Sequence, residues 1–163
     1  MILAVDVGNS NTTVGLFNGT GELLFRALLE TSRSKTRDQC AIELLGVFQL
    51  YGADACTVDG AILSSVVPPL TTIFTDAIAR LTGIPPMVVG PGIRTGLNIK
   101  AEIHNQLGSD IVASSVAAIA KYPSPIVMVD MGTATSLSLI VGSVYEGCII
   151  MPGLALALDA LSE

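Results

Sequence analysis

The chain of 163 residues is acidic and apolar: its net charge is −6, half of its residues are hydrophobic and 13% are charged. An acidic chain without a basic stripe repels nucleic-acid backbones, so we expect no nucleic-acid partner. A membrane-spanning helix needs about 20 nearly uninterrupted apolar residues. The apolar runs here are short and broken by polar residues, and no signal segment opens the chain. We therefore expect no membrane association and a cytoplasmic location.

The three cysteines are odd in number, far apart in sequence and without the spacing of a metal site. These residues are Cys40, Cys56 and Cys148. We expect buried, reduced thiols rather than a disulfide or a zinc site.

The first part of the chain predicts three antiparallel strands, followed by helices and strands in alternation. The expected strands cover residues 2–5, 12–17, 22–29, 59–64 and 87–89. The expected helices cover residues 34–51 and 70–82. Pro68 and Pro69 fit the opening of the second helix, and Gly83 fits its end. The following segment, 91–105, is expected to be irregular.

The second part begins with a helix over 108–121, whose residues Val112, Val116 and Ile119 form one apolar face. The opening pattern of the chain then recurs. The expected strands cover 126–129, 135–141 and 144–151, and a final helix covers 154–161. This recurrence indicates a duplicated unit whose second copy is incomplete. We therefore predict an α/β fold with two domains, at 1–107 and 108–163.

Two strand–turn–strand loops, Asp6–Thr13 and Asp130–Thr135, occupy matching places in the repeat. In each, an aspartate ends a buried strand and a glycine follows two residues later. Glycine lets backbone N–H groups approach an anion, because no Cβ intervenes. An aspartate fixed at a strand end can hold Mg²⁺, which bridges phosphate oxygens. Either loop alone reads as an ordinary hairpin, but their repetition predicts a site that grips a polyphosphate from both sides.

A series of short motifs resembles type III pantothenate kinases, and the resemblance covers essentially the whole chain. In order, the motifs are Asp6-x-Gly8-Asn9-x-Asn11, Ser64-Ser65-Val66-Val67-Pro68, Thr95-Gly96-Leu97, Gly108-Ser109-Asp110, Asp130-Met131-Gly132-Thr133-Ala134-Thr135, and Gly147 with Pro152-Gly153. The resemblance implies the actin-like, sugar-kinase and Hsp70-like superfamily. Its members contain duplicated ribonuclease-H-like domains with mixed sheets, and the second domain would be incomplete here.

The resemblance also implies a role for individual residues. Asp6 would lie by Mg²⁺ and the ATP phosphates, with Gly8, Asn9 and Asn11 shaping the first loop. Gly132, Thr133 and Thr135 would form the second phosphate loop, and Asp130 would lie near a monovalent cation, K⁺ or NH₄⁺. Gly108, Ser109 and Asp110 would contact the substrate. Asp110 would be the general base that takes a proton from its primary hydroxyl.

The implied activity is ATP-dependent phosphorylation of pantothenate to 4'-phosphopantothenate, the first step of coenzyme A biosynthesis, by a homodimer. Several positions depart from the family pattern. Ile111 replaces an arginine that helps to hold pantothenate, and Leu137-Ser138 stands where Phe-Asp is frequent. A tyrosine and an Asn-Pro pair are replaced at Ala101, Ile103 and His104. A binding paralogue without activity or with another substrate therefore stays open, as does a phosphatase of the same superfamily.

Four polar residues have two possible interpretations each. Without the resemblance, Asp110 would be read as a helix N-terminal cap. Arg94 either reaches an anionic group from a loop that borders the cleft or lies on the surface. His104 and Glu102 are expected to be solvent-exposed loop residues rather than catalytic groups.

Overall fold

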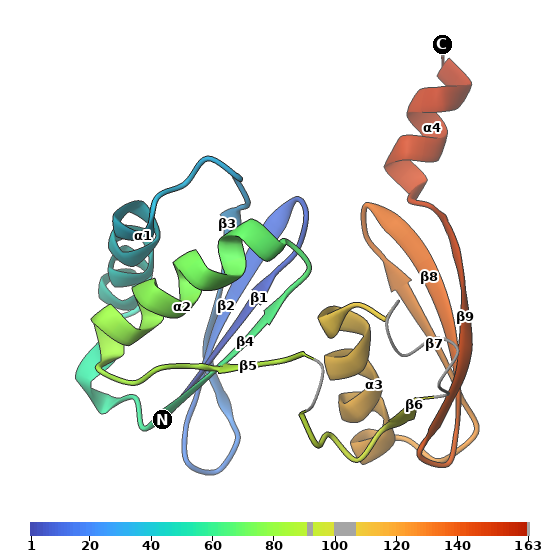
Figure 1. Ribbon diagram of the computed structural model, residues 1–163, viewed down its shortest axis with the longest axis horizontal. Coiled ribbons are helices and arrows are strands. Elements are labelled where there is room, and N and C mark those ends of the chain that lie inside the picture. The colour runs from blue at the N-terminus through green and yellow to red at the C-terminus, as the bar shows by residue number, and fades with distance from the viewer. Residues whose placement is uncertain (91–92, 100–106, 163) are drawn as a thin grey trace. The chain divides into compact units, whose positions relative to one another are not determined.

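The computed structural model describes residues 1–90, 93–99 and 107–162. The chain forms two compact units, Met1–Gly90 and Pro91–Glu163, which are coloured from blue to green and from yellow to red in Figure 1.

The first unit contains a mixed five-stranded sheet in the order β3-β2-β1-β4-β5. Strands β1, β2 and β3 are antiparallel neighbours, whereas β4 runs parallel to β1, and β5 parallel to β4. The strands are β1 (Ile2–Val7), β2 (Asn11–Phe17), β3 (Leu23–Glu30), β4 (Gly60–Ser65) and β5 (Met87–Val88). In this topology the end of β1 lies beside the start of β2 and the end of β4.

Two helices, α1 (Arg37–Leu50) and α2 (Pro68–Thr82), pack on each other and on one face of this sheet (Figure 1). Thr36 caps α1 in a capping box with Gln39, which satisfies amide groups that the first helical turn leaves unpaired. The helices share a core with alternate residues of β1, because a strand points successive side chains to opposite faces. A short 3-10 helix, η1 (Ala55–Thr57), precedes β4.

The second unit contains a four-stranded sheet in the order β6-β9-β8-β7. The strands are β6 (Asn98–Ile99), β7 (Ile126–Met131), β8 (Ala134–Val141) and β9 (Val144–Pro152). Helix α3 (Ser109–Lys121) covers one face, where Ile126, Ile140 and Tyr145 are buried. Helix α4 (Leu154–Ser162) follows β9 and contains no buried residue.

The opposite face of this second sheet is apolar and exposed. The side chains of Val127, Val129 and Met131 are each more than half exposed, and Val127 pairs in register with Leu139 on β8. Among the described residues, no helix is both long enough and apolar enough to cross a membrane.

The sequence predicted every α-helix, though not η1, and nearly every strand of the described part of the chain, in an α/β fold with mixed sheets. The expectation of an irregular 91–105 was partly wrong, because Asn98 and Ile99 form β6 and pair with β9. The same pairing joins residues 98–99 to the second unit, whereas the sequence analysis placed the domain boundary after residue 107.

Two predictions about burial also need correction. Only Cys40 is a buried thiol; Cys56 and Cys148 are free but exposed. On α3, the apolar contacts with the core run through Ile111, Ala118 and Ile119, whereas Val112 and Val116 were expected on that face. Compared with the expectation, α3 is therefore turned about its own axis, so that Ile111 rather than Val112 faces the core.

Candidate functional site

The first loop is a tight turn between β1 and β2. The Gly8 N–H donates to the Asn11 carbonyl at 3.0 Å, and a Cβ at Gly8 would lie 2.9 Å from that oxygen. Glycine is therefore needed here for close backbone packing. The Gly8 amide and the Asn11 carbonyl satisfy each other inside the turn, so these two residues shape the loop, and the exposed Asn9 lies at its tip.

Asp6 lies on β1 opposite Thr13 on β2 and beside Ser64 on β4. Its side chain is on the sheet face away from the helices, because its neighbours Val5 and Val7 are buried in the core. The chain leaves β4 through Ser65, whose hydroxyl accepts from the Val67 N–H at 3.2 Å. The register therefore places Asp6 and Ser64 side by side at the carboxyl ends of β1 and β4, beside the first loop.

The segment between β3 and α1 is joined to the first loop by hydrogen bonds. The Thr31 N–H donates to the Ser10 carbonyl at 3.0 Å, and the hydroxyls of Thr12 and Thr31 are 2.8 Å apart. The Arg33 guanidinium Nη2 lies 3.5 Å from Asn9 Oδ1. Sequence reasoning missed Arg33, although the antiparallel pairing of β2 with β3 returns the chain to this loop.

The second loop is a tighter turn between β7 and β8. The Gly132 N–H donates to the Ala134 carbonyl at 3.0 Å, and Met131 pairs with Thr135. Asp130 and Thr133 are exposed, and Thr135 is half-buried. Asp130 therefore precedes the turn by the same interval as Asp6, as the repeat predicted, although this turn is shorter.

Gly153 packs directly against the backbone of the second loop. It is buried, and its N–H donates to the Thr133 carbonyl at 3.0 Å. A Cβ at this position would overlap the carbonyl oxygens of Gly132 and Thr133 and would lie 2.8 Å from the Thr133 carbonyl carbon. The start of α4 can therefore approach the loop only because residue 153 is glycine; the Pro152-Gly153 motif is the signal in the sequence.

The predicted substrate-binding residues lie at the start of α3. Gly108 is the N-cap residue, and Ser109 and Asp110 are in the first turn. Asp110 Oδ1 accepts from the Ile111 N–H at 2.8 Å. An acid in the first turn is stabilised by the helix dipole. The Ile111 side chain packs against the core of the second unit.

A buried hydroxyl pair lies under α3. The Tyr145 and Ser138 hydroxyls are 2.8 Å apart, and both residues are buried. Burial first, and then the neighbouring Cys148 and Asp110, raise the pKa of Tyr145 to about 12, although the hydrogen bond with Ser138 lowers it. Asp110 therefore lies within electrostatic reach of Tyr145, a link that the sequence analysis missed.

The first loop suits a magnesium ion that arrives with a nucleotide. The described residues contain no cluster of three or more histidine, cysteine or acidic side chains that could hold a metal ion. Mg²⁺ in phosphate-binding sites usually keeps several waters and uses one or two carboxylates together with substrate phosphates. Asp6 and Asp130 each place a carboxylate beside a loop, which is the kind of group that could hold such an ion, and the Ser64 hydroxyl lies beside Asp6.

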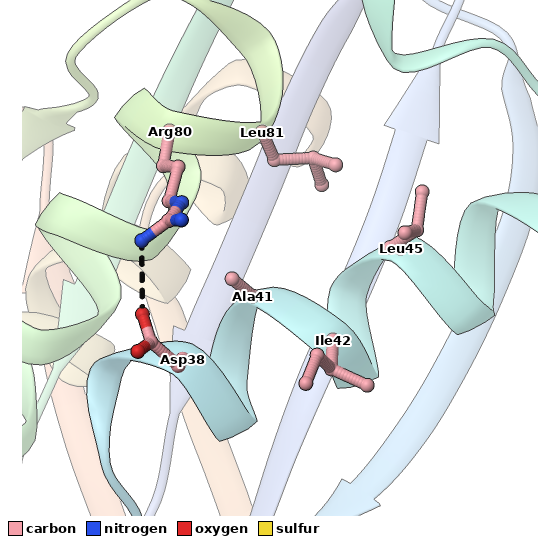
Figure 2. Close-up of a pocket in the computed structure, with 6 residues that line it drawn as sticks. All are labelled: Asp38, Ala41, Ile42, Leu45, Arg80 and Leu81. Carbon is pink, nitrogen blue, oxygen red and sulfur yellow. Dashed lines mark hydrogen bonds and ion pairs between the residues drawn. The ribbon is translucent and has the colours of Figure 1, made fainter.

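A groove between α1 and α2 is lined by residues that do not belong to the two loops. It has a volume of about 440 Å³ and is lined by Asp38, Ala41, Ile42, Leu45, Arg80 and Leu81. Figure 2 shows Arg80 bonded to Asp38 across one end of it, at 3.0 Å. None of its lining residues belongs to the predicted site. It is a mainly apolar surface groove closed at one end by an ion pair.

The remaining residues that the sequence singled out are Arg94 and four residues at 101–104. Arg94 is exposed and belongs to the second unit. Ala101, Glu102, Ile103 and His104 lie outside the described residues.

A family model and individual relatives point to the same protein family. The model of the family described as "Type III pantothenate kinase" matches residues 2–163. A type III pantothenate kinase of Listeria monocytogenes is 40% identical over 162 residues, which make up 99% of this chain and 62% of that protein. The chain thus spans less than two thirds of the length of this relative.

Solved structures with the same fold include a sugar kinase and a phosphatase. A Sinorhizobium meliloti protein described as a 2-dehydro-3-deoxygalactonokinase has a TM-score of 0.58 at 13% identity, covering 100% of this chain and 57% of its own. The Aquifex aeolicus Ppx/GppA phosphatase has a TM-score of 0.54 at 15% identity, covering 98% and 54%. At these identities the likeness shows a shared fold, and it supports the predicted fold class.

Proposed function

Because the chain belongs to the type III pantothenate kinase family, we propose that it takes part in ATP-dependent phosphorylation of pantothenate, the first step of coenzyme A biosynthesis. The observation that carries this proposal is the repeated hairpin. In both units an aspartate precedes a turn in which a glycine N–H bonds to the returning strand at 3.0 Å. Each of these turns lies beside an exposed carboxylate and therefore suits a phosphate group and its cation.

The chain's own groups would bind, orient and neutralise the phosphates. Asp6 would hold Mg²⁺ through oxygen, and Asn9 would contact the phosphate chain from the first loop. Thr133 and Thr135 would contact it from the second loop, and Asp130 would lie by a monovalent cation. When bound, the cations neutralise charge on the transferring phosphoryl group, which is where most of the catalysis of phosphoryl transfer arises.

Asp110 is the proposed general base. A carboxylate in the first turn of α3 is held by the Ile111 N–H, and its charge is stabilised by the helix N-terminus. A carboxylate can accept a proton from a primary hydroxyl as phosphate is transferred. Gly108 and Ser109 would position the substrate beside it.

A coupled ADP-release assay with ATP, Mg²⁺ and K⁺, with and without pantothenate, tests the proposal. We expect release that depends on pantothenate and falls by roughly 100-fold or more in Asp110→Asn, as removal of a general base typically does. Asp159→Asn on α4 is a matched control and should keep wild-type turnover. An Asp110→Asn protein with normal turnover would show that Asp110 is not the base.

A second candidate function rests on Ile111. The family carries an arginine at this position, whereas Ile111 packs into the core of the second unit and offers no charge to a carboxylate. This contact favours a binding paralogue that keeps the phosphate loops. Calorimetry that detects Mg-ATP binding, together with no pantothenate-dependent ADP release, would select this candidate.

The family resemblance also leads us to propose a homodimer. The apolar side chains exposed on one face of β7–β9 support an interface with another protein surface, because large apolar patches are rarely left in water. Light scattering would report the number of copies.

A further inference from the structure

Arg33 is placed beside the first loop by a rigid segment. On its N-terminal side, Thr31 bonds to Ser10 and Thr12 of the loop. On its C-terminal side, Lys35 Nζ donates to the Glu30 carbonyl at 2.6 Å and to the Glu43 carboxylate at 2.9 Å. The capping box at Thr36 then fixes the start of α1. The backbone that carries Arg33 is therefore held on both sides, and its guanidinium reaches Asn9.

Of the lysine and arginine side chains of the first unit, only Arg26 and Arg33 form no ion pair with a described residue, and of these two only Arg33 reaches the first loop. Lys35 is paired with Glu43, and both Arg37 and Arg80 are paired with Asp38. Within the described part of the chain, Arg33 has no carboxylate within ion-pair distance, and its observed partner is the neutral amide of Asn9. The guanidinium is exposed and leaves most of its five donors available to a ligand.

We propose that Arg33 is a phosphate-binding residue beside the first loop, and that its guanidinium pairs with oxygens of the nucleotide's phosphate chain while Asn9 orients it. This rests on the proposed function. The chemical reason is charge balance: the nearest ionisable loop group is the Asp6 carboxylate, so a polyphosphate needs positive charge from bound cations and from Arg33. A guanidinium fork also fits two phosphate oxygens at once, which a lysine cannot do.

The test compares Arg33→Gln and Arg33→Lys with Arg26→Gln. Arg26 is an exposed arginine of β3 that pairs with Gly15, away from the loop end of that strand, so its substitution removes the same charge elsewhere. Calorimetry would measure the affinity for Mg-ATP and for tripolyphosphate, which lacks the nucleoside. Urea unfolding of each variant would check that the fold is unchanged, as expected for an exposed side chain.

We expect Arg33→Gln to lower the affinity for Mg-ATP and for tripolyphosphate by roughly 10- to 100-fold, which is the range for the loss of a charge-assisted hydrogen bond. Arg33→Lys should lie between Arg33→Gln and wild type, and Arg26→Gln should match wild type. Equal binding by wild type and Arg33→Gln would overturn the inference and leave the proposed function standing.

Three other outcomes separate the inference from the proposed function. If Arg33→Gln raises the KM for pantothenate and leaves Mg-ATP affinity unchanged, the guanidinium serves a carboxylate and the inference is wrong. If wild type binds neither Mg-ATP nor tripolyphosphate, both the inference and the proposed function fail. Weakened phosphate binding without pantothenate-dependent turnover would support Arg33 and remove pantothenate as the substrate.

Discussion

Substitution of Gly153 by alanine should displace the backbone of the second loop and destabilise the protein. The new Cβ would overlap two backbone carbonyl oxygens, those of Gly132 and Thr133, which cannot rotate away as a side chain can. Helix α4 must therefore move off the loop, and the 3.0 Å hydrogen bond from Gly153 to Thr133 is lost. Overpacking costs about 1–3 kcal/mol and the lost hydrogen bond about 0.5–1.5 kcal/mol, so we expect a loss of roughly 2–4 kcal/mol.

Urea unfolding followed by circular dichroism measures this loss. With a slope of about 1–3 kcal/mol per molar urea, the midpoint should fall by about 1 M or more. Mg-ATP affinity should fall as well, because Gly132 and Thr133 shift. Gly19→Ala is the matched control: its Cβ would meet nothing within 4 Å, and its stability should stay within about 0.5 kcal/mol. A Gly153→Ala protein with wild-type midpoint and affinity would refute the reasoning.

Four further predictions concern the second unit. Asp130→Asn should weaken Mg-ATP binding at least about tenfold, as for a lost interaction of about 1.4 kcal/mol, by calorimetry; unchanged affinity would mean that this loop does not serve the phosphates. Ser115→Ala should stabilise the protein by about 0.5–1.5 kcal/mol, because the buried Ser115 hydroxyl has no hydrogen-bond partner among the described residues. Ser138→Ala should destabilise it by about 1–3 kcal/mol, since the Tyr145 hydroxyl loses its partner; the opposite order of urea midpoints would contradict both. Tyr145 should make stability fall at high pH. Its pKa is about 12 when folded and about 10 when unfolded, so the folded state holds the proton more tightly. This contribution is complete below pH about 10 and is lost as the pH rises through about 12. The urea midpoint of Tyr145→Phe should therefore fall less over this range than that of wild type, and an equal fall would contradict the assignment.

The elements could be predicted because local signals and packing agree in this chain. Turn residues separate short apolar runs, Thr36 and Gln39 form a capping box, and Gly83 ends α2 with a φ of 75°. Strand β6 could not be predicted, because it has two residues and depends on pairing with β9, far along the chain, and on packing of Ile99 against the core of the second unit. The exposure of Cys56 and Cys148 likewise depends on which face of each element is covered.

The loops of the candidate site could be located from the repeat, but their supporting contacts could not. Arg33 reaches Asn9 across 24 positions of the chain, and Tyr145 reaches Ser138 through the register of β8 and β9. Gly153 was visible as a motif, yet its role follows from the backbone atoms that a Cβ would strike. Such contacts between distant segments arise from tertiary packing, which a local pattern does not encode.

The most direct test of the central claim is identification of the product by ³¹P NMR after incubation with ATP, Mg²⁺, K⁺ and pantothenate. The account predicts a phosphomonoester signal from 4'-phosphopantothenate that appears together with ADP and is absent without pantothenate. ATP that stays intact, or that yields only inorganic phosphate whether or not pantothenate is present, would contradict it.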